Sequence, residues 1–182
     1  MNKEKIHNIE NEILLFRKIN HEQANDMYAY LSDEDVKRYI GWPLMNTITE
    51  THDLIDRLLK RENKGAHLYA SVILRSNNKV IGNVMLFDFD DEAHHAEVGY
   101  LFSKEYWGQG FGTQSLRLLD ELAFKEMRLH KLHAKVVAEN IGSLKILQKN
   151  GYDIEGQLKD HFYIDDKYHD AILLGKINPL DI

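Results

Sequence analysis

The sequence predicts a single layered domain over residues 1–182, of α/β or α+β class, built on a mixed sheet. Two observations carry this prediction. β-rich runs and helical stretches follow in the order β-αα-βββ-α-β-α-ββ, and the three central runs have no helix between them. The chain of 182 residues has only two prolines and neither a repeat nor a low-complexity linker, which favours one domain.

The first elements are a strand and two helices. The run EILLFRKI at residues 12–19 predicts the strand, and residues 21–32 and 49–63 have helical patterns. The second helix begins at a candidate N-cap, Thr49. Between the helices, RYIGWP should bend the chain, because Pro43 ends whatever element precedes it.

The middle of the chain predicts three strands and a helix. Residues 68–74 and 80–89 are β-rich runs joined by the turn signal Asn77-Asn78, and residues 96–103 form a further strand. From Gly110 onward the apolar spacing changes to that of a helix. The apolar face of this helix consists of Leu118, Leu119, Leu122, Ala123 and Met127.

The last third predicts a strand, a short helix and a hairpin. LHAKVVA at residues 132–138 is the strand, and residues 142–150 form a helix that Gly151 closes. Residues 158–164 and 167–175 then pair around Asp165-Asp166 as a terminal hairpin.

Composition and charge exclude several classes of function. The formal net charge of −6 argues against non-specific nucleic-acid binding, because phosphates attract a basic surface. The chain has no cysteine, which excludes thiol nucleophiles, disulfides and zinc–thiolate sites. The N-terminus has no long apolar run such as a signal peptide or membrane span needs. We therefore expect a cytoplasmic protein that binds no membrane.

The most informative stretch is YWGQGFGT, which places Gly108, Gly110 and Gly112 at alternate positions before a helix. Glycine is costly to order. A helix N-terminus attracts anions through its free amides and its dipole, and glycines let a phosphate approach the backbone closely. A tight turn whose glycines serve only close packing is the alternative.

Two known phosphate-binding motifs do not fit this stretch. A P-loop has Lys and then Ser or Thr after its last glycine, whereas Gly112 is followed by Thr113 and Gln114. A dinucleotide fingerprint has G-x-G-x-x-G after the first strand of a βαβ unit. Here the spacing is G-x-G-x-G, deep in the chain.

The strand VGYLF, the loop WGQGFGT and the helix that follows resemble the acyl-CoA pyrophosphate loop of the GNAT acetyltransferases. The pattern of that superfamily is Gln/Arg-x-x-Gly-x-Gly/Ala, with its glycines here at Gly110 and Gly112. Its first position is Trp107 in this chain, a variant that resembles the branch acetylating the N-termini of ribosomal proteins.

A second segment is similar to the same branch: Asn140-x-x-Ser143 followed by Gly151-Tyr152. The resemblance covers nearly the whole chain. It implies the GNAT fold, an α+β domain with a mixed, mostly antiparallel sheet flanked by helices. In that fold two central strands splay apart to admit the cofactor.

The resemblance implies acetyl-CoA as co-substrate. Backbone amides of the glycine loop would hold the pyrophosphate, and the end of the preceding strand would pair with the pantetheine amides as with an added strand. Asn140 would contact the pantetheine or pyrophosphate region, cap the helix that follows, or do both. The expected cofactor-binding residues are Tyr100, Leu101, Phe102, Trp107, Gly108, Gln109, Gly110, Phe111, Gly112, Thr113 and Asn140.

Acetyl transfer to an amine needs a neutral amine and a polarised thioester carbonyl. Glu97, on the strand beside the expected cleft, is the candidate general base, acting through water. A solvent-facing strand carboxylate is the alternative. Backbone amides near Phe102 would polarise the carbonyl as an oxyanion hole.

The leaving thiolate has a pKa of about 8.5, with cysteine as its model, so it departs without a strong acid. Many superfamily members have a tyrosine four residues before the glycine at position 151, but this chain has Leu147 there. Ser143 is the candidate acid, as the resemblance to the ribosomal-protein branch suggests. A purely structural hydroxyl at the helix N-terminus is the alternative.

The histidines do not predict a metal site. His94 and His95 are neighbours on a predicted strand and would face opposite sides. His130 and His133 flank the start of another strand. We therefore expect no metal.

The acceptor should enter opposite the cofactor, between the early helices and the terminal hairpin. Candidate walls of that cleft are Tyr39, Trp42, Phe162 and Tyr163, with ordinary core packing as the alternative. The hairpin is acidic, which suits a cation, and the tail also resembles polyamine N-acetyltransferases, although Leu147 counts against that assignment. The acidic residues are Asp160, Asp165, Asp166 and Asp170.

The sequence therefore predicts an acetyl-CoA-dependent N-acetyltransferase. Its expected acceptor is the α-amine of a protein, a peptide or an amino acid, and a polyamine or another small amine is the alternative. A homodimer is a possible assembly. Two other classes stay open at this point: a catalytically silent acyl-CoA-binding domain and a phosphate-binding module for another nucleotide.

Overall fold

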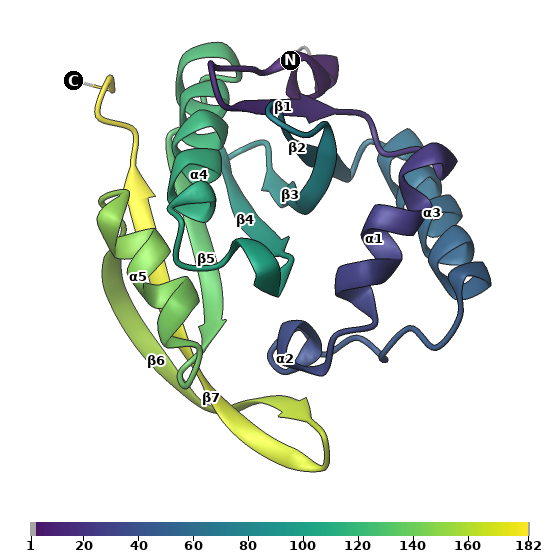
Figure 1. Ribbon diagram of the computed structural model, residues 1–182. Helices are drawn as coiled ribbons and strands as arrows, with labels where there is room; N and C mark the ends of the chain where they lie inside the picture. Colours follow the sequence, from purple (N-terminus) through teal and green to yellow (C-terminus); the bar gives the residue numbers. More distant parts are fainter. Residues whose placement is uncertain (1–2, 182) are drawn as a thin grey trace.

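The computed structural model describes residues 3–181 and is built on a seven-stranded sheet in the order β1-β2-β3-β4-β5-β7-β6 (Figure 1). Neighbouring strands are antiparallel except β4 and β5, which are parallel. The predicted mixed, mostly antiparallel sheet is confirmed. The strands are β1 (Leu14–Arg17), β2 (His67–Leu74), β3 (Lys79–Asp90), β4 (His95–Phe102), β5 (Lys131–Val137), β6 (Asp153–Ile164) and β7 (Lys167–Ile177).

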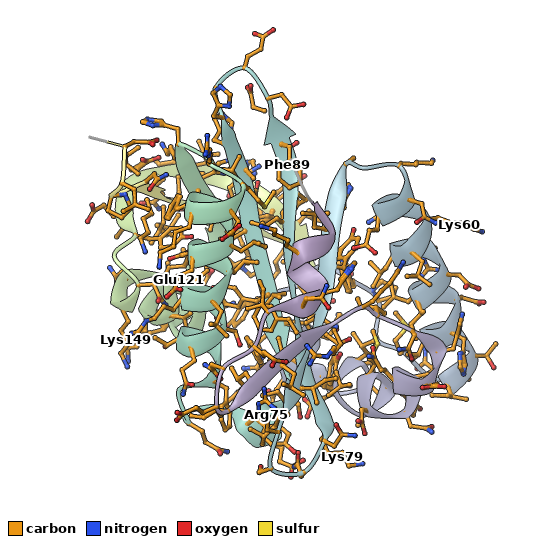
Figure 2. All side chains as sticks on the ribbon, turned by 90° about the horizontal axis from the view of Figure 1, so that it is seen from above. Lys60, Arg75, Lys79, Phe89, Glu121 and Lys149 are labelled. Carbon is orange, nitrogen blue, oxygen red and sulfur yellow. The ribbon has the colours of Figure 1, made fainter. Side chains whose placement is uncertain are left out.

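Helices cover both faces of the sheet. One face packs against α4 (Phe111–Glu121) and α5 (Ile141–Lys149), and the other packs against α1 (Ala24–Leu31) and α3 (Ile48–Asn63). Figure 2 shows this layering from above, with the central strands between α4, marked by Glu121, and α3, marked by Lys60. Each face has its own cluster of buried apolar side chains.

The remaining helical segments are short, and they are η1 (Lys3–Asn8), η2 (His21–Gln23), α2 (Glu34–Lys37), η3 (Lys104–Tyr106) and the π-helical turn η4 (Leu122–Glu126). The sequence did not predict α2, because four residues are too few to show a helical period. Its N-cap is Asp33, whose carboxylate accepts from the amides of Asp35 and Val36. In the described residues, no helix is both long enough and apolar enough to cross a membrane.

Two local predictions were wrong. The N-cap of α3 is Thr47 and not Thr49, because the Thr47 hydroxyl accepts from the Glu50 amide while the Glu50 carboxylate accepts from the Thr47 amide. This reciprocal pair satisfies two amides that would otherwise lack partners. His94 lies in the turn before β4, with φ of +54°, so it is not a strand neighbour of His95.

The two central strands splay apart as the sequence analysis expected. β4 and β5 pair only over their first residues, from His95 opposite Lys131 to Glu97 opposite His133. Beyond that point β4 continues to Phe102 with β3 as its strand partner, while β5 continues to Val137 with β7. Among residues 3–181, no strand therefore pairs with one edge of the second half of β4.

The terminal hairpin turns at Asp165 and Asp166, as predicted. Both residues have positive φ, +48° and +60°, a conformation that aspartate tolerates in tight turns. Strand β6 begins earlier than predicted. The sequence did not indicate its first residues as a strand, because almost all side chains of β6 are exposed and show no apolar alternation. Figure 1 shows the hairpin extending past α5 toward α2, where Lys37 forms an ion pair with Asp165.

Candidate active site

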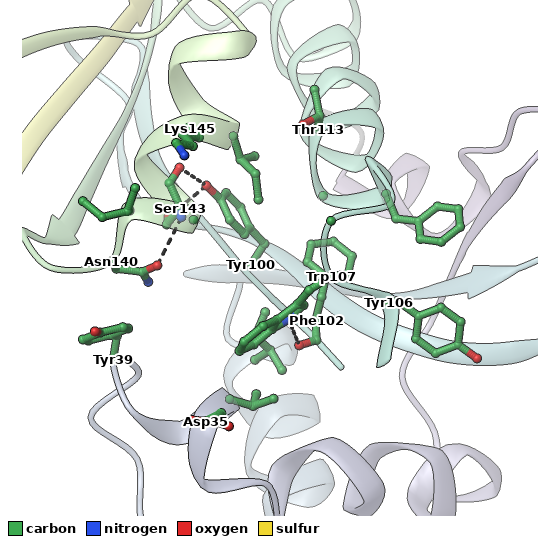
Figure 3. A pocket seen from close by; sticks show the side chains of 18 of the residues that line it. Asp35, Tyr39, Tyr100, Phe102, Tyr106, Trp107, Thr113, Asn140, Ser143 and Lys145 are labelled. Atoms are coloured by element: carbon green, nitrogen blue, oxygen red, sulfur yellow. Dashed lines mark hydrogen bonds between the residues drawn. The ribbon is translucent and has the colours of Figure 1, made fainter. Parts of the chain in front are cut away.

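A cleft of about 600 Å³ lies beside the unpaired half of β4 (Figure 3). It is lined by Tyr100–Phe102 of β4, by the glycine loop before α4, and by one side of α5 along its whole length, from Ile141 to Lys149. Residues 35, 36 and 38–40, in and after α2, form the opposite wall. All of the predicted cofactor-binding residues line this cleft except Gln109, whose side-chain amide donates to the carbonyl of Glu105 instead.

The three glycines of the loop have two different roles. Gly108 and Gly110 have φ of +74° and +85°, in the left-handed region, and a Cβ on either would meet no atom within 4 Å. These two provide a turn with open space in front of it. A Cβ on Gly112 would lie 2.7 Å from Cδ1 of Ile146, so this glycine lets α4 pack closely on α5. The packing interpretation therefore applies to Gly112, while the anion-site interpretation of Gly108 and Gly110 stays a prediction.

The loop presents the N-terminus of α4 to the cleft. Gly110 occupies the N-cap position, and no side chain there accepts from the first amides of the helix. These amides, together with the positive end of the helix dipole, favour an anion. The indole of Trp107 donates to the carbonyl of Phe102 over 2.8 Å and so fastens the loop to the end of β4. This hydrogen bond is a structural reason for a tryptophan at position 107.

On the other side of the cleft, the N-terminus of α5 holds Ser143. The side-chain oxygen of Asn140 accepts from the Ser143 amide over 3.1 Å, so the predicted N-cap is confirmed. The phenol of Tyr100 lies 3.0 Å from Oγ of Ser143 and 3.1 Å from its carbonyl oxygen. Burial raises the pKa of Tyr100 well above its usual range. Leu147 is fully buried in the core and does not line the cleft.

Glu97 lies where β4 and β5 part. It is only 6 % exposed, so the interpretation as a solvent-facing carboxylate was wrong. Its Oε2 is 2.9 Å from Nζ of Lys135 and 3.9 Å from Nδ1 of His133, both on β5. Burial lowers the pKa of His133. Glu97 is not among the residues that line the cleft, and its role as base stays a prediction.

Charged residues at the cleft were missed by the sequence analysis. Lys145 and Lys149, one turn apart on α5, are exposed and line it, and their spacing on one helix face could have indicated them. Asp35 lines the opposite wall, where the Lys104 ammonium and the Arg38 guanidinium beside it hold the pKa of its carboxyl below the usual value.

The predicted acceptor-binding residues have different surroundings. Tyr39 lines the cleft. Trp42 packs against the apolar cluster of α1 and α3. Phe162 and Tyr163 lie on the hairpin and are not among the lining residues. The Tyr163 ring contacts the Tyr168 ring at a tilt of 50°, with ring centroids 4.9 Å apart. Acceptor binding by these four residues stays a prediction, and the geometry favours it only for Tyr39.

The hairpin carboxylates also lie outside the cleft lining. Lys37 binds Asp165, and the Tyr163 hydroxyl donates to Asp166. Asp170 accepts from the Gln157 side chain and from the backbone amide of Asp160. Within residues 3–181, no three His, Asp or Glu side chains are grouped as a metal ion would require.

The glycine loop, the splayed strands and the capped α5 are the parts that the resemblance implied. The family model for the acetyltransferase (GNAT) domain matches residues 14–153 of the chain. This chain belongs to the GNAT acetyltransferases.

Two curated relatives show how this GNAT chain compares with named proteins. It is 31 % identical over 147 residues to the uncharacterized N-acetyltransferase YnaD of Bacillus subtilis. The aligned region covers 80 % of this chain and 82 % of the relative. It is 25 % identical over 156 residues to the spermidine N(1)-acetyltransferase of Escherichia coli K12, covering 86 % and 81 %.

Solved structures of acetyltransferases share the fold. The ribosomal-protein-S5-alanine acetyltransferase of Vibrio fischeri has a TM-score of 0.79 at 25 % identity, over 94 % of this chain and 96 % of that one. The spermidine N-acetyltransferase of Vibrio cholerae, solved with CoA and spermine, has a TM-score of 0.80 at 20 % identity, over 92 % and 97 %. The chain is therefore an acetyl-CoA-dependent N-acetyltransferase, and the non-enzymatic classes are set aside.

Proposed function

We propose that this GNAT enzyme acetylates the α-amine of a protein, a peptide or an amino acid. The observation that carries the proposal is the placement of the carboxylates. None of the four hairpin aspartates lines the cleft. In the part of the chain that the structure describes, the carboxylates that line it are those of Asp35 and Glu139. Both have basic partners: Asp35 pairs with Lys104 and Arg38, and Glu139 with His169. A polyamine with several positive charges would need unpaired carboxylates along its path.

The proposed reaction is direct transfer. The neutral amine nitrogen forms a bond to the acetyl carbonyl carbon, and the carbonyl electron pair moves to the oxygen, where backbone amides near Phe102 stabilise it. The oxyanion then collapses, the C–S bond breaks, and its electron pair leaves on the CoA sulfur. The amine proton passes to Glu97 through water. An α-amine has a pKa of about 8 and asks less of this base than a lysine-like amine does.

The binding roles follow the cleft. The amides of the glycine loop and the α4 N-terminus hold the pyrophosphate, and the unpaired edge of Tyr100–Phe102 pairs with the pantetheine. Asn140, beside Ser143, contacts the pantetheine or pyrophosphate region in addition to capping α5.

The cellular setting is part of the same proposal. The enzyme acts in the cytoplasm as one domain over residues 1–182, without nucleic acid or membrane. The net charge of −6 and the lack of cysteine support this setting. A homodimer is the proposed assembly, and exposed apolar side chains on β6 and β7, among them Ile154, Tyr168 and Ile177, support it.

The test is a panel assay of CoA release from acetyl-CoA with N-terminal peptides, free amino acids, spermidine, spermine and aminoglycosides. We expect the best peptide or amino acid to exceed spermidine in kcat/KM by at least about tenfold. A reaction without amine measures hydrolysis. A higher kcat/KM for spermidine or spermine would contradict the proposal and favour the polyamine alternative, which the Escherichia coli relative represents.

A further inference from the structure

We propose that Tyr100 is a positioning residue that aims the Ser143 hydroxyl at the CoA sulfur, and that Ser143 stabilises the leaving thiolate by a hydrogen bond without giving up its proton. The inference rests on acetyl transfer with pantetheine along β4, as proposed above, and it does not depend on which amine is the acceptor.

The first support is the contact itself. Tyr100 Oη lies 3.0 Å from Ser143 Oγ and 3.1 Å from the Ser143 carbonyl oxygen, across 43 residues of sequence. Figure 3 shows both side chains at the cleft, with dashed lines for these contacts. The Asn140 oxygen fixes the backbone of Ser143 at the same time. The hydroxyl of Ser143 is therefore held at a defined place in the wall.

The second support is a count of hydrogens. The two hydroxyls have one hydrogen each. In one arrangement Tyr100 donates to the Ser143 carbonyl and Ser143 donates to the phenol oxygen. In the other, Tyr100 donates to Ser143 Oγ, and the serine hydrogen is free to point into the cleft. The two arrangements differ only in the rotation of the two hydroxyl groups. A sulfur atom in the cleft can therefore favour the second arrangement without any movement of a heavy atom.

The third support is the order of acidities. A thiol has a pKa of about 8.5 and a phenol one of about 10, and burial raises the pKa of Tyr100 further. Full proton transfer from this phenol, or from an alkyl hydroxyl, to the thiolate is therefore uphill. The electron pair of the broken C–S bond stays on sulfur, which takes its proton from solvent later. A hydrogen bond to the charged sulfur remains favourable, because hydrogen bonds to ionised groups are the stronger ones.

The arrangement also gives a reason for Leu147. Leu147 is fully buried in the core and supplies no hydroxyl. In this chain a phenol reaches the same helix from β4, and it acts through Ser143 rather than on the sulfur directly.

The test titrates the thiol of CoA bound to the enzyme, followed by the ultraviolet absorbance of the thiolate, with no acceptor present. We expect the pKa of the bound thiol to be about one unit higher in Tyr100→Phe and Ser143→Ala than in the wild type. Ser143→Thr keeps a hydroxyl and should retain most of the wild-type value. The double variant should differ little from Ser143→Ala alone, because both changes remove one hydrogen-bond chain.

Kinetics give a second measurement with an amine that the enzyme accepts. Tyr100→Phe should lower kcat about tenfold and leave KM for acetyl-CoA within about twofold. The matched controls are Tyr28→Phe and Ser32→Ala. They remove hydroxyls that donate to backbone carbonyls outside the cleft, those of Asn46 and Tyr28. They should keep wild-type rates.

An unchanged thiol pKa in both Tyr100→Phe and Ser143→Ala would overturn the inference. So would a basic limb of the wild-type kcat profile that Tyr100→Phe removes, because it would show proton donation by the phenol. If Tyr100→Phe does not fold, the comparison of Ser143→Ala with Ser143→Thr decides. The titration needs no acceptor, so a failure of the α-amine proposal would leave its result intact.

Discussion

The two halves of β4 differ, although they belong to one strand. Its first residues, His95 to Glu97, have β3 on one edge and β5 on the other. There the Glu97 carboxylate is buried and paired with Lys135. Its last residues, Tyr100 to Phe102, have β3 on one edge only and line the cleft with their other side. We call His95 to Glu97 the closed half of β4 and Tyr100 to Phe102 the open half. The closed half fixes the position of a charged side chain, and the open half exposes backbone and hydroxyl groups to a ligand.

This difference divides the proposed chemistry along the strand. The candidate base lies in the closed half, where a carboxylate can be kept dry and oriented. The groups that would meet CoA lie in the open half, where an edge without a strand partner can accept the pantetheine. The predictions below test each half, beginning with the largest expected effect.

The largest effect is expected in the closed half. If Glu97 is the base, Glu97→Gln should lower the amine-dependent rate by about two orders of magnitude and remove the acidic limb of the pH–rate profile. CoA affinity, measured by calorimetry, should barely change, because Glu97 does not line the cleft.

The matched control is Lys135→Met, which breaks the ion pair but keeps the carboxylate. This variant should retain much more activity than Glu97→Gln. Equal losses in the two variants would mean that the ion pair matters only for structure, and the comparison between the halves would lose its catalytic meaning.

A smaller effect is expected in the open half, at the loop. Gly110→Asp should weaken CoA binding at least about tenfold, a difference of about 1.4 kcal/mol, because a negative charge would stand where the pyrophosphate binds. Calorimetry with CoA measures this loss. Gly110→Asn has the same shape and the same strain at φ of +85°, without the charge.

The charge effect is the difference between the aspartate and asparagine variants. Thermal melting should show that both stay folded. Equal CoA affinities in the two folded variants would show that the pyrophosphate does not bind at this loop.

The smallest effect is a pH dependence of stability in the closed half. Burial lowers the pKa of His133, against the opposing effect of Glu97, while His95, Lys135 and Lys131 add to the lowering. The unfolded chain therefore binds a proton more readily than the folded one, and this contribution to stability is lost as the pH falls through about 6.5.

Between about pH 7.5 and about pH 5.5, the free energy of unfolding should fall more in the wild type than in His133→Gln, by no more than about 1 kcal/mol. Urea unfolding at the two pH values measures this difference. Identical slopes in the two proteins would show that the closed half is not dry at His133.

The features that the sequence by itself determined are those that depend on neighbouring residues. Gly108 and Gly110 indicated a turn before a helix, since few other residues tolerate positive φ. Asn140 indicated the start of α5, since its side-chain oxygen can accept a hydrogen bond from the amide of Ser143, three residues later. The order of strands and helices, the hairpin at Asp165-Asp166 and the GNAT resemblance came from the same local patterns.

Only the tertiary structure decided how distant segments meet. It showed that β5 leaves β4 after Glu97, that Gly112 serves packing against Ile146, and that the phenol of Tyr100 reaches Ser143. It also showed that none of the four hairpin aspartates lines the cleft. Local propensities act over one helical turn or one strand pair, whereas these contacts depend on how the two faces of the whole sheet are packed. Side-chain direction at the cleft is thus a property of the assembled layers and not of any single stretch of sequence.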